Sequence, residues 1–593
     1  MENTQTKYRT GGSFLVEPIN EAVVYSREDF TDEHREIYAM VKEFDKETIL
    51  EKKEDIEKFD KELSLSLIKE MGELGLLGID IPEEYGGMEL DKVTSAIVAE
   101  ALTYSPSFAV TWSVQTGIGL LPIVWFGTPE QKEKYLPKIA TGEIISAYGL
   151  TEPTAGSDAL AGKTTAVLSD DGKHYILNGE KIFITNGGWA DVFIVFAQVD
   201  GNKFSAFIVD RDTEGFSTGA EEKKMGMKGS STTSLIFQNA KVPVKNLLYK
   251  VGAGATIAFN VLNIGRFKLG ASGVGGSKNG IEAAAKYALE RRAFGKPIAQ
   301  FDAIVKKIAD MTVCTFAADS MVYRTIGLLQ KEIDDLDKSD PDYYIHVGEA
   351  MEKFAIETSM TKVFGSETSQ FVVNEGLQIF GGYGFLEEYP MASAYRDNRI
   401  NQIWEGTNEI NRQIITGYMM KKALMEELPI RDAISSIEQF MSNGKLKEND
   451  GPLAIECEAI ETGKRLALYI FNEALNKFGQ DLKHEQQITE MLADIFTDLY
   501  TAESTVVRVQ KIMKDDNHDR TVTSIAKIFT AEMVLRLLNK SLTALNGIYG
   551  GQMTAPVIDQ LRHFQGRMLL TTDIINLKRE VAQRIYSQTE YPF

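Results

Sequence analysis

The sequence contains 593 residues, more than one compact core usually holds, and predicts roughly three or four domains. Its hydrophobic content of 43% is that of an ordinary globular protein, and its formal net charge is −21. A chain this acidic is poorly suited to bind nucleic acid or an anionic membrane surface. Two cysteines and six dispersed histidines predict no disulfide framework and no metal site.

The N-terminus lacks the apolar region of a signal peptide, and residues 1 to about 25 are predicted to form a loose leader. An uncharged stretch runs from Phe108 to Phe126. It contains several polar residues and Pro122, and no basic residue flanks it closely. We therefore expect a buried helix rather than a transmembrane segment, and a cytosolic protein.

Residues 1–145 are predicted to be helical from Thr31 onward, because apolar residues recur at intervals of three and four. The glycine-rich run at 75–87 is predicted to be a loop between helices. Residues 146–251 instead contain short β-type runs separated by turn signals, including Asn178-Gly179. The expected strands are 165–167, 175–177, 181–185, 192–198, 204–209 and 234–237. Because these strands form a block, they predict an antiparallel barrel or sandwich and argue against a Rossmann fold.

Helices are predicted to return in residues 252–428, and the expected segments are 252–265, 266–292, 302–331 and 342–381. The polar stretch from Ser442 to Pro452 marks a linker within a further helical block at 429–593. An apolar stripe in that block predicts packing rather than a cofactor site; its residues are Ile525, Phe529, Met533 and Leu537.

An acid, Glu405, precedes Gly406 and Thr407 in a predicted tight turn. Thr407 can act as the N-cap of the following helix, where Glu409 lies in the first turn and suits the helix dipole. Burial against the neighbouring Trp404 would raise the pKa of the Glu405 carboxyl and make it a better base. Taken alone, Glu405 is also consistent with an ordinary surface turn.

The segment from Tyr395 to Ile415, together with the upstream run from Gln378 to Gly384, resembles the acyl-CoA dehydrogenase family in residue type and spacing. The resemblance covers about residues 30–425 and implies an α+β fold. The implied domains are N-terminal helices (1–145), a β-barrel or sandwich domain (146–251), a helical bundle with the catalytic Glu (252–428) and an extra helical domain (429–593). The length and position of that extra domain resemble the very-long-chain branch.

The resemblance implies FAD-dependent α,β-dehydrogenation of a fatty acyl-CoA in β-oxidation, with Glu405 removing the α proton. Two branches of the family carry their Glu before an Arg that corresponds to Arg266, but Gly265 stands here. Electrons are expected to pass to an electron-transferring flavoprotein, and the chain is expected to form a homodimer or homotetramer. Long-chain substrates are expected from the likeness to the very-long-chain branch and from the small residues Ser113, Gly117 and Gly119.

Three further motifs resemble flavin-contacting segments of the family: Ala147–Asp158, Lys181–Gly188 and Glu290–Pro297. The expected cofactor contacts are Tyr148, Leu150, Thr151, Gly156, Ser157, Phe183, Thr185, Arg291, Phe294, Gln378, Gly381, Gly382, Thr407 and Glu409. The expected substrate contacts are Ser157, Arg266 and Gly406. The resemblance assigns Thr151 to the flavin pyrimidine edge, Thr185 to flavin N5 and Arg291 to the pyrophosphate. The chain departs from the family at Phe183, usually Trp, and at Asp302, where many relatives carry Gln.

Three alternatives remain open from the sequence. An acyl-CoA oxidase shares this fold and this base, and differs in the access of oxygen to reduced flavin. A nucleic-acid-binding relative is disfavoured by the net charge of −21. A non-catalytic assembly factor is disfavoured because Glu405, Thr151 and Thr185 are all retained.

Overall fold

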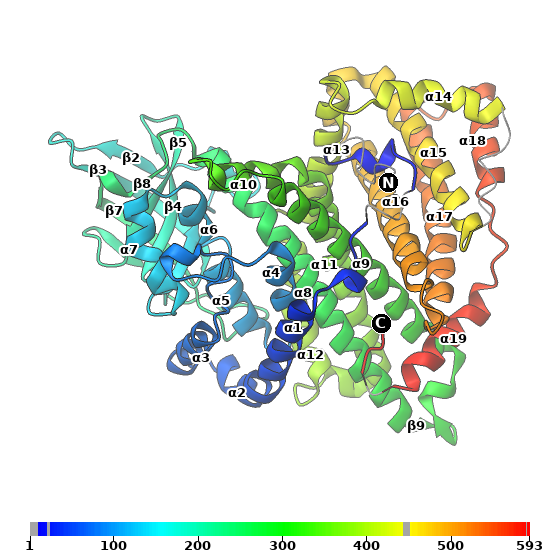
Figure 1. Ribbon diagram of the computed structural model, residues 1–593, viewed down its shortest axis with the longest axis horizontal. Helices are drawn as coiled ribbons and strands as arrows, with labels where there is room; N and C mark the ends of the chain where they lie inside the picture. Colours follow the sequence, from blue (N-terminus) through cyan, green and yellow to red (C-terminus); the bar gives the residue numbers. More distant parts are fainter. Residues whose placement is uncertain (1–9, 20–23, 443–450, 589) are drawn as a thin grey trace. The chain divides into compact units, whose positions relative to one another are not determined.

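The computed structural model describes residues 10–19, 24–442, 451–588 and 590–593. The chain divides into two compact units. One unit comprises residues 31–275 and 329–352, and the other comprises residues 1–30, 276–328 and 353–593. Figure 1 labels most of the helices and strands of both units.

The unit of residues 31–275 and 329–352 begins with a run of short helices. These are α1 (Asp32–Phe44), α2 (Leu50–Glu57), α3 (Lys61–Glu73), α4 (Lys92–Ala101), α5 (Pro106–Thr116), α6 (Leu121–Phe126) and α7 (Pro129–Ala140). Five of them start at a side chain that accepts a backbone hydrogen bond, namely Thr31, Asp60, Asp91, Ser105 and Thr128. The first part of α8 (Gly254–Glu290), the last turns of α9 (Asp302–Asp334) and α10 (Tyr343–Lys353) also belong to this unit.

The uncharged stretch is one candidate membrane span by length and composition, from Pro106 to Phe126. In the structure it forms two helices, α5 and α6, which are separated at Gly117. Of its most apolar window, 83% is buried. This burial supports the prediction of a helical core segment. Helix α5 contacts strands β1 and β3, and α6 contacts β8.

The sheet of this unit has the strand order β6-β7-β3-β2-β4-β5-β8, and β1 pairs with β4. The strands are β1 (Ser146–Gly149), β2 (Thr165–Leu168), β3 (His174–Thr185), β4 (Val192–Val199), β5 (Lys203–Asp210), β6 (Phe216–Thr218), β7 (Thr232–Pro243) and β8 (Leu247–Leu248). All predicted strand runs lie within these elements. The sheet is mostly antiparallel, but β4 pairs in parallel with β1 and β2, which the sequence pattern did not predict.

The predicted turn at Asn178-Gly179 is wrong, because both residues lie inside the single strand β3. The pairing of β3 with β7 shifts register between Leu177 and Gly179, so the chain bulges without reversing. The Asn178 side chain accepts a hydrogen bond from the Asn239 backbone N–H at 2.8 Å. A turn-type dipeptide therefore serves here to bend a strand.

The unit of residues 1–30, 276–328 and 353–593 is built from long helices, α8 contributing its second part. They are α9 (Asp302–Asp334), α11 (Ala355–Phe380), α12 (Pro390–Asn398), α13 (Asn408–Leu424), α14 (Ile430–Ser442), α15 (Ala454–Phe478), α16 (Gln486–Ile512), α17 (Thr521–Ile548), α18 (Ala555–Arg567) and α19 (Ile574–Tyr586). The predicted segments 252–265 and 266–292 are continuous in α8, whereas 342–381 breaks at Phe354 into α10 and α11. Most of the predicted linker, residues 443–450, lies outside the described residues.

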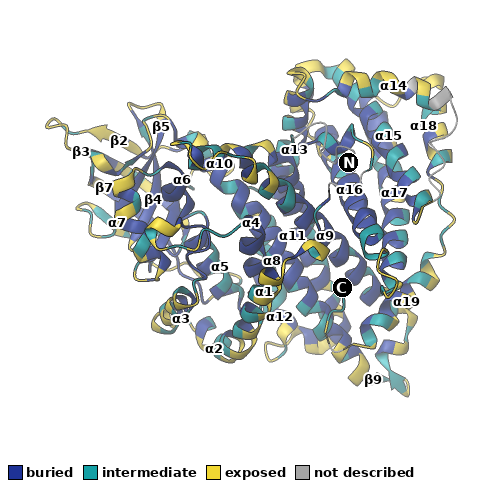
Figure 2. Ribbon diagram, viewed as in Figure 1, coloured by how far each residue is buried: buried dark blue, intermediate teal, exposed yellow. Residues whose placement is uncertain are grey.

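Helices α15, α16 and α17 pack against one another and form much of the buried core of this unit. Figure 2 shows much of α16 in the buried colour. The predicted apolar stripe on α17 is confirmed as packing core, since Ile525, Phe529, Met533 and Leu537 are each at most 2% exposed.

The leader is not loose where the structure describes it. Phe14 and Leu15 are buried in the helical core of this unit. The Gly12 backbone N–H donates to the Glu357 carboxylate at 2.7 Å, and the Ile19 N–H donates to Glu461 at 2.9 Å. Long-range contacts of this kind leave no signal in the sequence of the leader itself.

Candidate active site

Glu405 lies in a turn between a 3-10 segment (Arg399–Gln402) and helix α13. Its φ is 57°, and that of Gly406 is 81°, so two consecutive residues adopt the left-handed conformation. For a residue with a side chain this conformation costs about 1–2 kcal/mol, and it persists only where neighbouring groups hold it. The Glu405 side chain is half-buried.

Two buried side chains hold this turn through its carbonyl oxygens. The Asn411 side-chain amide donates to the carbonyls of Glu405, Gly406 and Thr407, at 3.3, 2.8 and 3.1 Å. The Lys362 ammonium on α11 donates to the Gly406 carbonyl at 2.8 Å. Both anchors are fully buried. The sequence analysis identified neither of them, although Asn411 lies inside the signature segment.

The predicted start of the following helix is confirmed. The Thr407 hydroxyl accepts a hydrogen bond from the Ile410 backbone N–H at 3.2 Å and caps α13. Glu409 lies in the first turn, where its own backbone N–H and the Thr407 side chain hold the pKa of its carboxyl below the ordinary value. The turn therefore places Glu405 directly before the positive end of a helix dipole.

A cavity of about 500 Å³ in the same unit brings together three predicted cofactor residues, Arg291, Gly381 and Gly382. Three aromatic and three aliphatic residues form the rest of its lining: Tyr287, Phe380, Tyr383, Ile298, Ile379 and Leu386. The Tyr287 and Phe380 rings stack with centroids 4.1 Å apart, and the Arg291 guanidinium lies 5.4 Å from the Tyr383 ring centroid. A cation beside flat aromatic surfaces suits a ligand that carries phosphate and a planar ring.

Phe294 and Gln378 are exposed at positions outside this lining. Phe294 lies between the short strands β9 (Arg292–Ala293) and β10 (Lys296–Pro297), with a φ of 50° and 96% exposure. Asp302, the position at which the resemblance implied a Gln in many relatives, forms an ion pair with Arg579 at 2.8 Å. The Asp302 carboxylate is therefore engaged in an ion pair within the protein.

In the other unit, the Thr151 segment is joined to strand β3 by a buried ion pair. The Lys181 ammonium donates to the Glu152 carboxylate at 2.6 Å and to the Leu150 carbonyl at 3.3 Å. Burial acts to raise the pKa of the Glu152 carboxyl, but the Lys181 charge and the hydrogen bonds that the carboxylate accepts from Lys181, Thr164 and Lys163 together hold the pKa below its ordinary value. The Ile182 backbone N–H also donates to the Thr151 carbonyl at 2.9 Å. Two predicted flavin segments, 147–158 and 181–188, are thus held side by side.

A second irregularity of β3 exposes an aromatic ring next to this junction. The register of β3 with β7 shifts between Lys181 and Ile184, and Phe183 there has a φ of 59° and 62% exposure. Thr185, at the end of β3, and Thr151, in the segment 147–158, are both half-buried. Gly156 and Ser157 are exposed, and a Cβ at Gly156 would meet no atom within 4 Å. An exposed ring beside two hydroxyls is a surface that a flat polar ligand can cover.

The remaining predicted residues lie in more closed surroundings. The Tyr148 ring is buried edge-on against Phe196, with centroids 5.1 Å apart. Arg266 is buried within α8 and donates to the Asn263 side chain at 2.9 Å. Gly265 precedes it, so α8 carries no carboxylate at that position.

Known proteins resemble this chain along most of its length. Residues 31–143, 147–240 and 252–420 match the N-terminal, middle and C-terminal domains of acyl-CoA dehydrogenases, and residues 462–563 match a further acyl-CoA dehydrogenase C-terminal domain. A probable acyl-CoA dehydrogenase of Bacillus subtilis strain 168 is 44% identical over 584 residues, which cover 98% of each chain. The chain belongs to the acyl-CoA dehydrogenase family.

Two further relatives bear on the cofactor and on the extra helices. The crystal structure of an acyl-CoA dehydrogenase complexed with FAD from Bacillus anthracis aligns with a TM-score of 0.95 at 43% identity, covering 98% of this chain and 100% of that one. A mitochondrial very long-chain specific acyl-CoA dehydrogenase of Bos taurus is 33% identical over 521 residues, 82% of this chain and 76% of the relative. The protein is an FAD-dependent acyl-CoA dehydrogenase, and its cofactor is FAD.

The residues of this acyl-CoA dehydrogenase fit FAD on their own chemistry. The exposed Phe183 ring with Thr151 and Thr185 suits a flat heterocycle that accepts hydrogen bonds. The cavity lined by Arg291 and the stacked aromatic pair suits a phosphate-bearing nucleotide.

Proposed function

We propose that this acyl-CoA dehydrogenase converts long-chain fatty acyl-CoA to the trans-2-enoyl-CoA, with Glu405 as the base that removes the α proton. The observation that carries the proposal is the anchored left-handed turn at Glu405. Strain of this kind is retained where it aims a side chain, and a surface turn needs no buried lysine to hold it. Gly265 removes the other family position for a base, so the assignment rests on Glu405.

In the proposed reaction each group of the chain has one role. The Glu405 carboxylate accepts the proton from the α carbon of the thioester. The Glu405 backbone N–H donates to the thioester carbonyl and stabilises the charge that develops on its oxygen. Thr151, Thr185 and Arg291 hold the cofactor through hydroxyl and guanidinium donors. Bound FAD supplies the oxidant for the β carbon, a two-electron chemistry that side chains lack.

The long-chain assignment is supported by the likeness to the bovine very long-chain enzyme. The glycines before α6 support it less. A Cβ at Gly117 would lie 2.6 Å from the Ser113 carbonyl oxygen, and one at Gly119 would lie 2.5 Å from the Ser146 hydroxyl. Close packing therefore accounts for both glycines without an acyl tunnel. We also propose a cytosolic homo-oligomer that acts in β-oxidation and passes electrons to an electron-transferring flavoprotein.

The first experiment is an anaerobic titration of the holoenzyme with palmitoyl-CoA, in which the absorbance of the flavin is monitored. We expect bleaching in the wild type and at least about a thousandfold slower bleaching in Glu405→Gln. Glu426→Gln is the matched control, because Glu426 also has a left-handed φ, of 58°, and pairs only with Arg431 among the contacts described for it. Equal bleaching in Glu405→Gln and Glu426→Gln would overturn the assignment of the base.

Two extensions separate the alternatives. Admission of air after bleaching distinguishes a dehydrogenase, which recolours slowly, from an oxidase, which recolours at once and releases peroxide. Turnover of octanoyl-CoA and palmitoyl-CoA tests the chain length, and a clear preference for octanoyl-CoA would refute the long-chain assignment. No bleaching with any acyl-CoA by flavin-loaded protein would favour the non-catalytic alternative.

A further inference from the structure

We propose that the extra C-terminal helices position the catalytic turn, through an ion pair between Arg412 on α13 and Asp494 on α16. This inference rests on the proposed role of Glu405 and adds positioning residues to it. Residues 429–593 then do more than enlarge the protein, because they set the place of the helix that begins two residues after Gly406.

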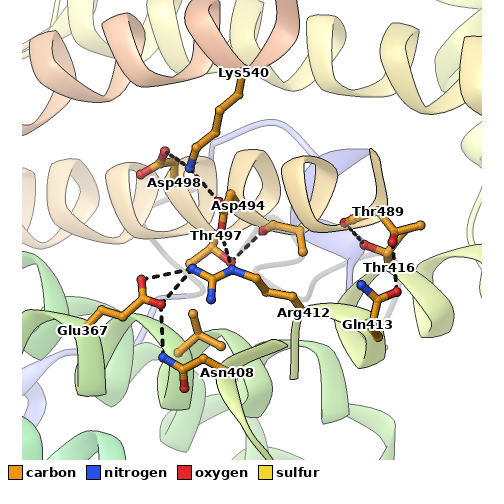
Figure 3. Close-up of polar contacts among 12 residues, drawn as sticks. Glu367, Asn408, Arg412, Gln413, Thr416, Thr489, Asp494, Thr497, Asp498 and Lys540 are labelled. Atoms are coloured by element: carbon orange, nitrogen blue, oxygen red, sulfur yellow. Dashed lines mark hydrogen bonds and ion pairs between the residues drawn. The ribbon is translucent and has the colours of Figure 1, made fainter. Parts of the chain in front are cut away.

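Helix α13 is held on two sides, by α11 and by α16. Its residues Asn408, Arg412 and Thr416 follow one another at intervals of four and therefore lie along one stripe of the helix. Figure 3 shows the polar side chains of this stripe reaching toward α11 and α16. A helix held along one stripe by two neighbours cannot rotate or slide without breaking those contacts.

On the α11 side, two sets of hydrogen bonds connect the stripe to the catalytic turn, which is the turn of Glu405, Gly406 and Thr407. Glu367 on α11 accepts from the Arg412 guanidinium at 3.0 Å and from the Asn408 side-chain amide at 3.0 Å. The Asn408 side-chain amide oxygen accepts a hydrogen bond from the Lys362 ammonium at 2.7 Å, and the same ammonium donates to the Gly406 backbone carbonyl. Arg412 is therefore connected to the turn through groups that each hold the next one in place.

The α16 side of the stripe belongs to the extra domain. The Arg412 Nε–H donates to Asp494 at 2.7 Å, and Lys540 on α17 pairs with the other Asp494 oxygen at 2.9 Å. One turn away, the Thr416 hydroxyl donates to the Thr489 backbone carbonyl at 2.7 Å. The Thr489 hydroxyl donates to the Gln413 side chain at 2.8 Å. These contacts fix α13 along its axis as well as around it (Figure 3).

Burial makes the Arg412–Asp494 contact strong enough for this role. The Arg412 and Asp494 side chains are 12% and 19% exposed, so water competes weakly for their hydrogen bonds. Charged hydrogen bonds of this kind exceed neutral ones in strength, and Arg412 makes them to carboxylates on two different helices. These hydrogen bonds oppose the tendency of the left-handed Glu405 backbone to relax. Loss of Asp494 removes the support from one side only.

The test compares two substitutions on α16, Asp494→Asn and Asp498→Asn, in the holoenzyme. Asp498 lies one helical turn from Asp494, pairs with Arg536 on α17 at 2.8 Å, and is the more buried of the two. Asp498 also pairs with Lys540, at 3.8 Å, so each substitution removes one carboxylate partner of that lysine. Asp498→Asn therefore makes the same chemical change on α16 but leaves the Arg412–Asp494 contact in place. Arg412→Lys is the conservative variant, because it retains the positive charge but lacks the guanidinium that can donate to Glu367 and Asp494 at the same time.

The first readout is amide hydrogen exchange of the turn and first helical turn, residues 404–411, without substrate. We expect exchange at least about fivefold faster in Asp494→Asn, an intermediate change in Arg412→Lys, and less than about a twofold change in Asp498→Asn. The second readout is the rate of anaerobic flavin bleaching by palmitoyl-CoA. We expect it to fall about tenfold in Asp494→Asn at an acyl-CoA affinity within about twofold of the wild type.

Equal exchange and equal bleaching in Asp494→Asn and Asp498→Asn would overturn the inference, as would slower bleaching in Asp494→Asn without faster exchange. Should Asp494→Asn fail to fold, Arg412→Lys carries the same comparison against Asp498→Asn. Failure of the proposed function is recognised separately, because the wild type itself would then not bleach with any acyl-CoA, whereas the exchange comparison stands without activity.

Discussion

The Lys362 ammonium donates a hydrogen bond to the Gly406 carbonyl oxygen at 2.8 Å, across 44 residues of the chain. Lys362 is fully buried, and its second acceptor is the Asn408 side chain at 2.7 Å. A buried cation is retained only where it has strong partners, and here the partners belong to the turn that carries Glu405. The lysine therefore connects the packing of α11 to the position of the proposed base.

Lys362→Met is expected to slow flavin bleaching about 10- to 100-fold, because the Gly406 carbonyl loses a charged donor and the turn relaxes. The flavin content should remain that of the wild type. The control is Lys464→Met, another buried lysine of the same unit, which contacts Glu17 and Glu503 and not the turn. Stopped-flow absorbance under anaerobic conditions measures both rates. Wild-type bleaching in Lys362→Met would contradict the expected role.

Glu405→Gly is expected to be more stable than Glu405→Ala by about 1 kcal/mol, because glycine adopts a φ near 57° without a steric cost. Both variants should lose bleaching to the same degree, since both lack the carboxylate. Urea unfolding compares their stabilities. The same pair of substitutions at Glu409, which lies in helical conformation, should show the opposite order. An alanine variant at least as stable as the glycine variant at position 405 would argue against stored strain.

Lys181→Met is expected to destabilise the protein by about 3–5 kcal/mol, because it leaves the Glu152 carboxylate buried without its cation. The double variant Lys181→Met/Glu152→Gln should recover more than half of that loss. FAD affinity should fall in the single variant, because Thr151 directly precedes Glu152 in the chain and would shift with it. Lys203→Met, which breaks the exposed pair of Lys203 with Asp200, is the control and should leave the stability close to that of the wild type. Urea unfolding and FAD titration provide the two readouts. A double variant that recovers none of the lost stability would contradict the pairing of Lys181 with Glu152.

Stability should depend on pH through Glu357, whose burial raises the pKa of its carboxyl from 4.5 to about 7. The folded protein then holds more protons than the unfolded chain between these values. The contribution of this group to stability is full below pH 4.5 and is lost as the pH rises through 7. A change of this size corresponds to about 3 kcal/mol.

Glu357→Gln removes this dependence while keeping an acceptor for the Gly12 backbone N–H. We therefore expect the melting temperature of the variant, relative to that of the wild type, to increase from pH 5 to pH 8. Glu490→Gln, at an exposed position of α16, serves as the control and should show no such gain. A difference between Glu357→Gln and wild type that stays constant with pH would refute the assignment.

Local sequence determined much of this protein. Thr407 caps α13 as predicted, because an N-cap requires only a hydroxyl three residues before the N–H that it accepts. The strand block and the helical blocks were also predictable, since their periodicities follow from the residues within each element. The prediction at Asn178-Gly179 was wrong because a dipeptide that permits a turn also permits a bulge, and the pairing with β7 selects between them.

Tertiary structure alone decided how the functional groups are held. Lys362, Glu152 and Asp494 meet their partners across 44, 29 and 82 residues of the chain, and no local pattern marks such pairs. The cavity beside Arg291 likewise depends on the rings of Tyr287 and Phe380, which lie on different helices. Sequence sets which chemistry each residue offers and which element it enters. The folded core sets which of these residues meet, because a charge buried inside it is costly unless it finds a partner.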